Sequence, residues 1–179
     1  MANEYVTEAD FSTILPSADS DLLSICREAS SRAIDNYTER FFYDSITSKT
    51  YPADAEIIID DLQSVTSVII DTDDALAAYV NIDSTDYYCL FPENSTPKTK
   101  IQLSETGVNV VITGTFGYGS VPLPVKQACM MLTRQLYSNA FAGELVSERT
   151  QTYSYKMAEQ DAQGLSPTVK MLLAPYKRI

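Results

Sequence analysis

Residues 108–142, VNVVITGTFGYGSVPLPVKQACMMLTRQLYSNAFA, read as a strand, a glycine-rich turn, two prolines and a long helix. The β-branched residues at the start suit a pleated, half-buried strand. From Val125 onward, apolar residues recur every three or four positions, as they do along one face of a helix. The segment therefore predicts a strand that leads through a tight corner into a helix over residues 122–142.

The corner itself contains three glycines and two prolines: Gly114, Gly117, Gly119, Pro122 and Pro124. Glycine permits positive φ in a sharp turn, and proline suits a first helical turn. The glycine order is GxxGxG, whereas a dinucleotide site needs GxGxxG, and no Gly-Lys-Ser/Thr of a P-loop follows. The prolines also remove two N–H donors that would face a phosphate. These residues predict a structural turn and no bound nucleotide.

Working outward, a short helix is expected over 7–15 and a long one over 21–41, with the run 17–20 offering helix caps. From 49 to 113 the apolar period becomes that of strands, separated by turn-forming residues. This β block is inserted between long helices and does not alternate with them. The order predicts an α+β fold with short antiparallel strands, and it argues against a doubly wound sheet.

The helix over 21–41 is amphipathic in sequence. Its expected core stripe consists of Leu22, Cys26, Ala29, Ala33 and Tyr37, extended by Ile25, Ile34 and Phe41. The charged residues occupy the opposite side. We therefore expect the stripe to face the protein core.

Gly143 is a natural end for the second long helix, and Ser166-Pro167 predicts the start of a short closing helix. The intervening residues 144–165 are mostly polar. A stretch of that length is functional or disordered in most compact proteins, so both an arm that orders on a neighbour and a flexible linker remain open. We divide the chain into a domain over 1–143 and a C-terminal arm with a short helix over 144–179.

Composition limits the function. The chain has 179 residues, 45% of them apolar, and it contains no histidine. The missing histidine removes Ser-His-Asp and Cys-His catalysis as well as histidine metal sites. Three cysteines at wide spacing, Cys26, Cys89 and Cys129, form no metal motif or disulfide framework. We expect a soluble protein with no catalytic residue, no metal and no cofactor, and with no signal peptide or membrane helix.

Charge is unevenly distributed. Residues 1–120 hold 6 Lys+Arg and 20 Asp+Glu, whereas residues 121–179 hold 7 Lys+Arg and 4 Asp+Glu. A protein that grips DNA would show a basic patch, so specific nucleic-acid binding is not expected. The acidic part serves either solubility or a surface along which DNA moves without adhering.

The order of features resembles a known family. It runs from "VTEADF" and "DLLSICREASSRAIDNYTERFF" through "QSVTSVIID" to "TFGYGSVPLPVKQA" and the ending "GLSPTVKMLLAPYKR". The ordered set is similar to the head–tail connector family (adaptor, or head-completion proteins) of tailed double-stranded-DNA bacteriophages. The resemblance covers about residues 5–178.

The resemblance implies a structural, non-enzymatic virion protein of the neck, assembled in the host bacterial cytoplasm. Such adaptors form a ring, usually dodecameric, that joins the portal to the stopper or tail-completion proteins and extends the DNA channel. DNA would then meet the protein only by non-specific passage, and no membrane is involved.

It also implies that the C-terminal arm reaches the portal or a neighbouring subunit. The candidate contact residues are Tyr153, Tyr155, Met157, Leu172, Leu173, Tyr176 and Arg178. Tyrosines suit interfaces because the ring is apolar and the hydroxyl is polar, although the same side chains could instead cover the chain's own core.

Two other functions stay open at this point. Another neck or tail subunit, such as a stopper or terminator, is the first, but these are usually mainly β, and two long helices favour the adaptor. A small cytosolic enzyme is the second, and the absent histidine disfavours it.

Overall fold

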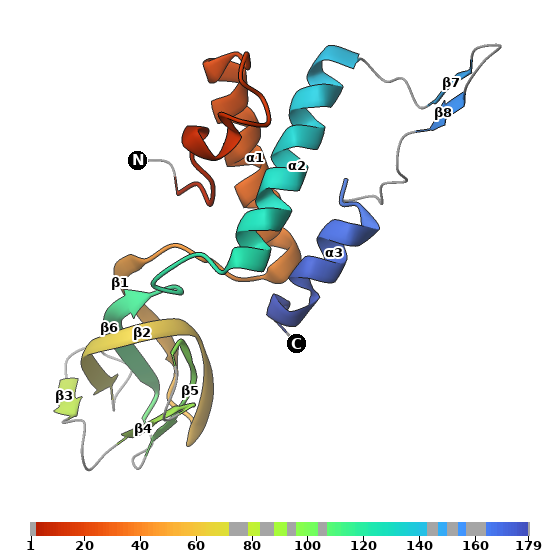
Figure 1. Ribbon diagram of the computed structural model, residues 1–179. Coiled ribbons are helices and arrows are strands. Elements are labelled where there is room, and N and C mark those ends of the chain that lie inside the picture. Colours follow the sequence, from red (N-terminus) through yellow and green to blue (C-terminus); the bar gives the residue numbers. More distant parts are fainter. Residues whose placement is uncertain are drawn as a thin grey trace. The chain divides into compact units, whose positions relative to one another are not determined.

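The computed structural model describes residues 3–71, 79–82, 88–92, 96–103, 107–142, 147–149, 154–156 and 164–178. The elements, in chain order, are η1 (Glu8–Phe11), α1 (Ser20–Thr38), β1 (Ser45–Pro52), β2 (Glu56–Asp71), β3 (Tyr79–Ile82), β4 (Tyr88–Phe91), β5 (Lys98–Leu103), β6 (Asn109–Phe116), α2 (Leu123–Ala142), β7 (Ser147–Arg149), β8 (Ser154–Lys156), α3 (Pro167–Leu173) and η2 (Ala174–Tyr176) (Figure 1). Helices flank an antiparallel β block, so the predicted α+β class is confirmed.

The chain forms two compact units. Residues 1–39 and 121–179 make the first, which we call the helical unit, and residues 40–120 make the second, the β unit. The β unit is thus an insertion between α1 and α2. This division differs from the sequence-based one, because it groups α3 with the long helices and separates the β block from them.

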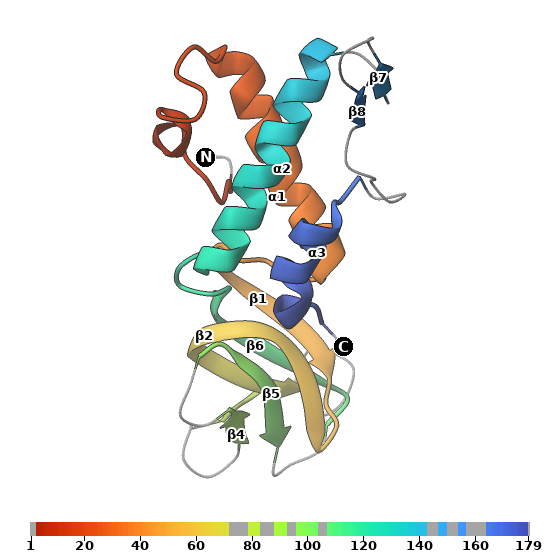
Figure 2. The ribbon, with the colours of Figure 1, turned by 45° about the vertical axis from the view of Figure 1, so that its right-hand side comes forward.

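In the helical unit, α1 and α2 lie side by side and run antiparallel (Figures 1 and 2). The backbone N–H of Asp19 donates to the Tyr137 hydroxyl at 2.9 Å, and Ser31 Oγ lies 3.6 Å from Cys129 Sγ. Residue numbers increase along α1 as they decrease along the facing side of α2, as they must for an antiparallel pair. The helix α3 packs against α2, and its residues Val169 and Leu173 are fully buried.

Local signals in the sequence explain where these helices begin and end. Asp19 caps α1 by accepting from the N–H of Leu22 at 2.9 Å, and Ser166 caps α3 by accepting from Val169. The helix α1 ends at Thr38 because Glu39 is left-handed at φ 56°, a common way for a helix to terminate. The predicted end at residue 41 was therefore wrong by three residues.

Other predicted bounds need similar corrections. The expected helix over 7–15 is only the 3₁₀ turn η1, and α2 starts at Leu123 because the Pro122 carbonyl is already the acceptor for the N–H of Lys126, at 2.9 Å. The β block extends beyond 49–113, from Ser45 to Phe116, because β1 and β6 pair along their whole length. Residues 144–165, expected to lack structure, contain the short antiparallel pair β7 and β8.

The β unit is an antiparallel sheet in the order β1-β6-β2-β5-β4, with β3 paired to β2. The apolar runs 56–59 and 65–71 belong to one strand of 16 residues, β2. Register shifts near Leu62 and Val65 bend this strand, so its first part pairs with β5 and the rest with β6. The bend lets one strand border two partners.

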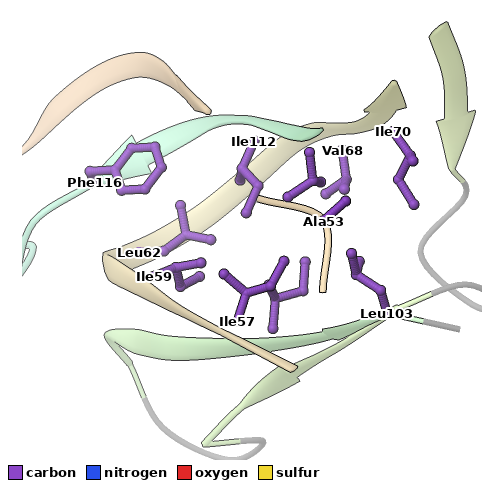
Figure 3. Close-up of a cluster of buried hydrophobic side chains, with 11 residues drawn as sticks. Ala53, Ile57, Ile59, Leu62, Val68, Ile70, Leu103, Ile112 and Phe116 are labelled. Atoms are coloured by element: carbon purple, nitrogen blue, oxygen red, sulfur yellow. The ribbon is translucent and has the colours of Figure 1, made fainter. Parts of the chain in front are cut away.

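The β unit has its own apolar core. Side chains from β2, β5 and β6 point into one interior, as Figure 3 shows for Leu62, Val68, Ile70 and Ile112, which are at most 1% exposed. Along β6 the buried positions alternate with half-buried ones, the period expected for a sheet with one covered face.

Candidate functional site

The corner between β6 and α2 is built by backbone constraints. A Cβ atom at Gly114 would lie 2.2 Å from the carbonyl oxygen of Ser64. Gly117 and Gly119 have φ of +123° and +71°, conformations that favour glycine. The Pro122 carbonyl accepts from the N–H of Lys126, and Pro124 is the second residue of α2. The three glycines thus lie where close approach or positive φ favours glycine, and we interpret the corner as structural.

Side chains next to the corner hold the two ends of the β unit together. The Arg40 guanidinium lies 2.5 Å from the Asp61 carboxylate, which is 8% exposed, and Phe42 packs on Tyr118 with ring centroids 4.9 Å apart. The N–H of Gly117 donates to the Asp61 carbonyl oxygen at 2.7 Å. The charges of Arg40 and Asp61 are paired with each other, so we interpret this cluster as structural.

The inner face of α1, which meets α2, is unusually polar. Thr133 donates to Ser30 Oγ at 3.0 Å, and Ser30 Oγ donates to the carbonyl of Cys26 at 2.7 Å. Ser30, Ser31, Thr38 and Thr133 are all 0% exposed. Hydroxyls that bond back to the helix can be buried at little cost, because their donors are satisfied.

The N-terminal segment closes this polar layer. The N–H of Tyr5 donates to Ser31 Oγ at 3.1 Å, and the Tyr5 hydroxyl donates to Asp35. Arg32 forms an ion pair with Asp35 at 3.1 Å. Burial raises the pKa of Asp35 to about 6, although the Tyr5 hydroxyl and Arg32 lower it in part. A buried carboxylate held by one hydrogen bond and one ion pair makes the stability of the fold depend on pH.

Two of the three cysteines have described side chains. Cys26 and Cys129 are both buried, and burial raises the pKa of Cys129 to about 11. A thiol with so high a pKa is almost wholly protonated at neutral pH and a poor nucleophile. The side chain of Cys89 lies outside the described part.

No catalytic constellation is seen in the described ranges. They contain no group of three or more Asp, Glu or Cys side chains that could hold a metal ion. None of the helices in the part of the chain that the structure describes is long and apolar enough to cross a membrane. Two exposed helix faces are the candidate sites for binding a partner.

The first is the side of α1 turned away from α2, which we call the outer α1 face; it consists of Asp21, Leu22, Ile25, Glu28, Ala29 and Ala33. Ile25 is 65% exposed and Ala29 is also exposed, while Leu22 and Ala33 are half-buried. The predicted core stripe was therefore wrong for much of its length. Of that stripe, only Cys26 and Ile34 are buried, because the buried side of α1 is the side that contains Ser30 and Ser31.

The second is the side of α2 turned to solvent, the outer α2 face, which consists of Leu123, Gln127, Met131, Arg134 and Ser138. These positions follow helical spacing, and all five are exposed, Leu123 by 79% and Met131 by 37%. Sequence reasoning missed both faces, because apolar residues at helical spacing look the same whether they face the core or a partner.

The structure places the predicted arm contacts unequally. Tyr153 and Met157 lie outside the described residues, and Tyr155 is in β8. Leu173 is fully buried, Leu172, Tyr176 and Arg178 are half-buried, and the N–H of Arg178 donates to the Thr38 carbonyl at 2.9 Å. Lys177 Nζ also lies 5.3 Å from the centroid of the Tyr37 ring. The last residues of the described chain are thus tied to the end of α1.

Comparison with known proteins yields structural relatives alone. No family model and no curated protein matches the chain. Among solved structures, the chain is similar to one in the neck of an empty GTA particle, computed with C6 symmetry, with a TM-score of 0.62 and 17% identity over 98% of this chain and 90% of that one.

Two further structures agree. A chain in the virion of the native gene transfer agent (GTA) particle has a TM-score of 0.57 and 18% identity over 98% of this chain and 90% of that one. A chain in the neck of the native particle, computed with C12 symmetry, has a TM-score of 0.53 and 18% identity over 100% and 96%. The resemblance to neck proteins noted in the sequence is therefore confirmed at the level of the fold: this chain has the fold of GTA neck chains.

Proposed function

We propose that this chain is a structural subunit of the neck of a tailed phage or phage-like particle. In this proposal it is an adaptor whose copies form a ring, join the portal to the stopper or tail proteins, and extend the DNA channel. The observation that carries the proposal is a fold shared with a GTA neck chain over 98% of this chain and 90% of that one.

The symmetry of the related particles supports the structural role. The neck structures that share the fold were computed with C6 and C12 symmetry, which fits a subunit that repeats around an axis. We infer a homo-oligomeric ring in the virion, assembled in the host cytoplasm.

Charge fits the passage of DNA. Residues 40–120 hold 12 Asp+Glu and 4 Lys+Arg. If this unit lines the channel, its net negative charge would keep the phosphate backbone from adhering. Portal contact through the C-terminal segment is part of the same proposal, with Tyr176 and Arg178 as the accessible candidates, whereas Leu173 would serve by holding α3 in place.

Electron microscopy tests the function. The chain is mixed with the portal protein of the same particle and imaged in negative stain. We expect a ring with an axial hole, seated on the portal. A compact monomer that ignores the portal would overturn the proposal, and binding only to a completed neck, below the portal, would point to the stopper or terminator.

A further inference from the structure

The outer α1 face contains an apolar side chain that a surface helix would normally bury, although α1 also buries Leu23, Cys26 and Ile34. An amphipathic helix normally buries its apolar residues and exposes its polar ones. Here Ser30, Ser31 and Thr38 are fully buried, while Ile25 is 65% exposed. The hydroxyls are buried at little cost because they donate to their own helix, but an isoleucine that is 65% exposed on a helix face is explained if another chain covers that face.

The outer α1 face also carries negative charge. Asp21 and Glu28 are exposed there, and neither makes an ion pair with a residue that the structure describes. Arg32 on the same helix is occupied by Asp35 and by the Asn3 carbonyl. The two carboxylates therefore remain available for a cation from another molecule.

The outer α2 face is its counterpart. It presents the apolar side chains of Leu123 and Met131, and its single charge is Arg134, which forms no ion pair with a described residue. No acidic residue occurs anywhere in α2. Leucine and methionine are large and adaptable, so they fit the shallow surface left by Ala29 and Ala33.

Charge separates in the same way across the helical unit. Residues 3–39 contain 8 Asp+Glu and 2 Lys+Arg, whereas residues 123–142 and 164–178 contain 5 Lys+Arg and no Asp or Glu. Such a subunit attracts a second copy placed with its acidic helix against the first one's basic helix. It has two different complementary faces, which is what a head-to-tail contact requires.

We propose that the outer α1 face of one copy packs against the outer α2 face of the next copy, and that this contact closes the ring. Ile25 lies against the Leu123 and Met131 side of the neighbour, and Arg134 of the neighbour pairs with Asp21 and Glu28. The inference rests on the proposed ring function and adds to it which surfaces meet. The occupant is a second copy of this chain, because the charges of the two faces are opposite.

Charge reversal gives a specific test with the full-length chain. Glu28→Lys places like charges at the contact, and so does Arg134→Glu, so each variant alone should lose self-association. In a mixture, Lys at position 28 of one variant meets Glu at position 134 of the other, and Glu28 of the second meets Arg134 of the first. An equimolar mixture should therefore form rings again, with the two variants alternating.

The apolar part is tested separately by Ile25→Arg, with Ile58→Arg as the matched control. Ile58 is 69% exposed and lies on β2, in neither of the two helix faces, so it controls for the loss of an exposed isoleucine. The affinity of self-association should fall at least tenfold in Ile25→Arg, whereas Ile58→Arg should assemble as the wild type does. Circular dichroism verifies that each variant is folded.

Sedimentation velocity and native mass spectrometry at high protein concentration distinguish the outcomes. Loss in the single variants with recovery in the mixture supports the inference. If Glu28→Lys, Arg134→Glu and Ile25→Arg all form rings as well as the wild type does, the assignment of the surfaces is wrong, but the proposed ring function is not affected. A wild-type chain that stays monomeric, both alone and on the portal, would overturn both.

Discussion

A Cβ atom at Gly117 would lie 2.2 Å from the carbonyl oxygen of Tyr43, a separation that no substituted residue tolerates. Gly117 also has φ of +123°, and its N–H donates to the Asp61 carbonyl at 2.7 Å. The start of the β unit therefore approaches its end at a glycine, directly after β6.

Gly117→Ala should be strongly destabilising, because the new methyl group meets backbone that cannot move aside. We expect a loss of about 2–3 kcal/mol or more in the free energy of unfolding. Gly119→Ala is the control: its φ is +71°, but the nearest atom to a new Cβ is the flexible Gln63 side chain at 3.4 Å. That variant should lose only about 1 kcal/mol. Urea denaturation followed by circular dichroism measures both, and equal losses would contradict the argument.

Leu173→Ala should destabilise the helical unit by about 2–5 kcal/mol, because it leaves a cavity where a fully buried leucine packed. Met171 lies two residues away in the same helix and is 67% exposed, so Met171→Ala is expected to change stability by less than about 0.5 kcal/mol. Thermal denaturation compares the two. A Leu173→Ala variant as stable as the wild type would mean that α3 is not part of the helical core.

Asp35 should make stability depend on pH. Its folded pKa is raised to about 6 from an ordinary 3.8, so the folded chain keeps this proton at pH values where the unfolded chain has lost it. The contribution of Asp35 to the free energy of unfolding is therefore greatest below pH 4 and falls as pH rises to about 6. At about 1.4 kcal/mol per unit of pKa, the fall is about 3 kcal/mol.

Asp35→Asn removes the titrating group while keeping an oxygen that can accept from the Tyr5 hydroxyl. The difference in unfolding free energy, wild type minus variant, should become more negative between pH 4 and pH 7. Other carboxylates cancel in this difference, including Asp10, whose pKa the Lys126 side chain lowers. Parallel stability curves across this pH range would show that Asp35 titrates normally in the folded chain.

Much of the secondary structure could be predicted from the sequence because helix starts and turns depend on residues close together in the chain. Ser166-Pro167 predicts a cap and first turn, and α3 begins there. The glycines and prolines of the corner likewise mark where β6 ends and α2 starts. Each of these signals depends on backbone angles and donors within a few residues.

Other features were not predictable in this way. The bend in β2 arises from register shifts against two different partners, which a strand's own residues do not encode. The arm contacts and the adaptor role stay predictions, since Tyr153 and Met157 lie outside the described residues and the solved relatives share only the fold.

The sequence by itself determined the α+β order of elements, the corner over 114–124 and the absence of histidine chemistry, because local backbone preference and composition decide these. Only the tertiary structure decided which side of α1 is buried. Leu22, Ile25 and Ala29 belong to the apolar stripe expected from the sequence, but packing buries Cys26 and Ile34 together with Ser30 and Ser31, whose hydroxyls donate to their own helix. That choice leaves Ile25 exposed, and it turns a predicted core face into the surface that we propose meets the next copy.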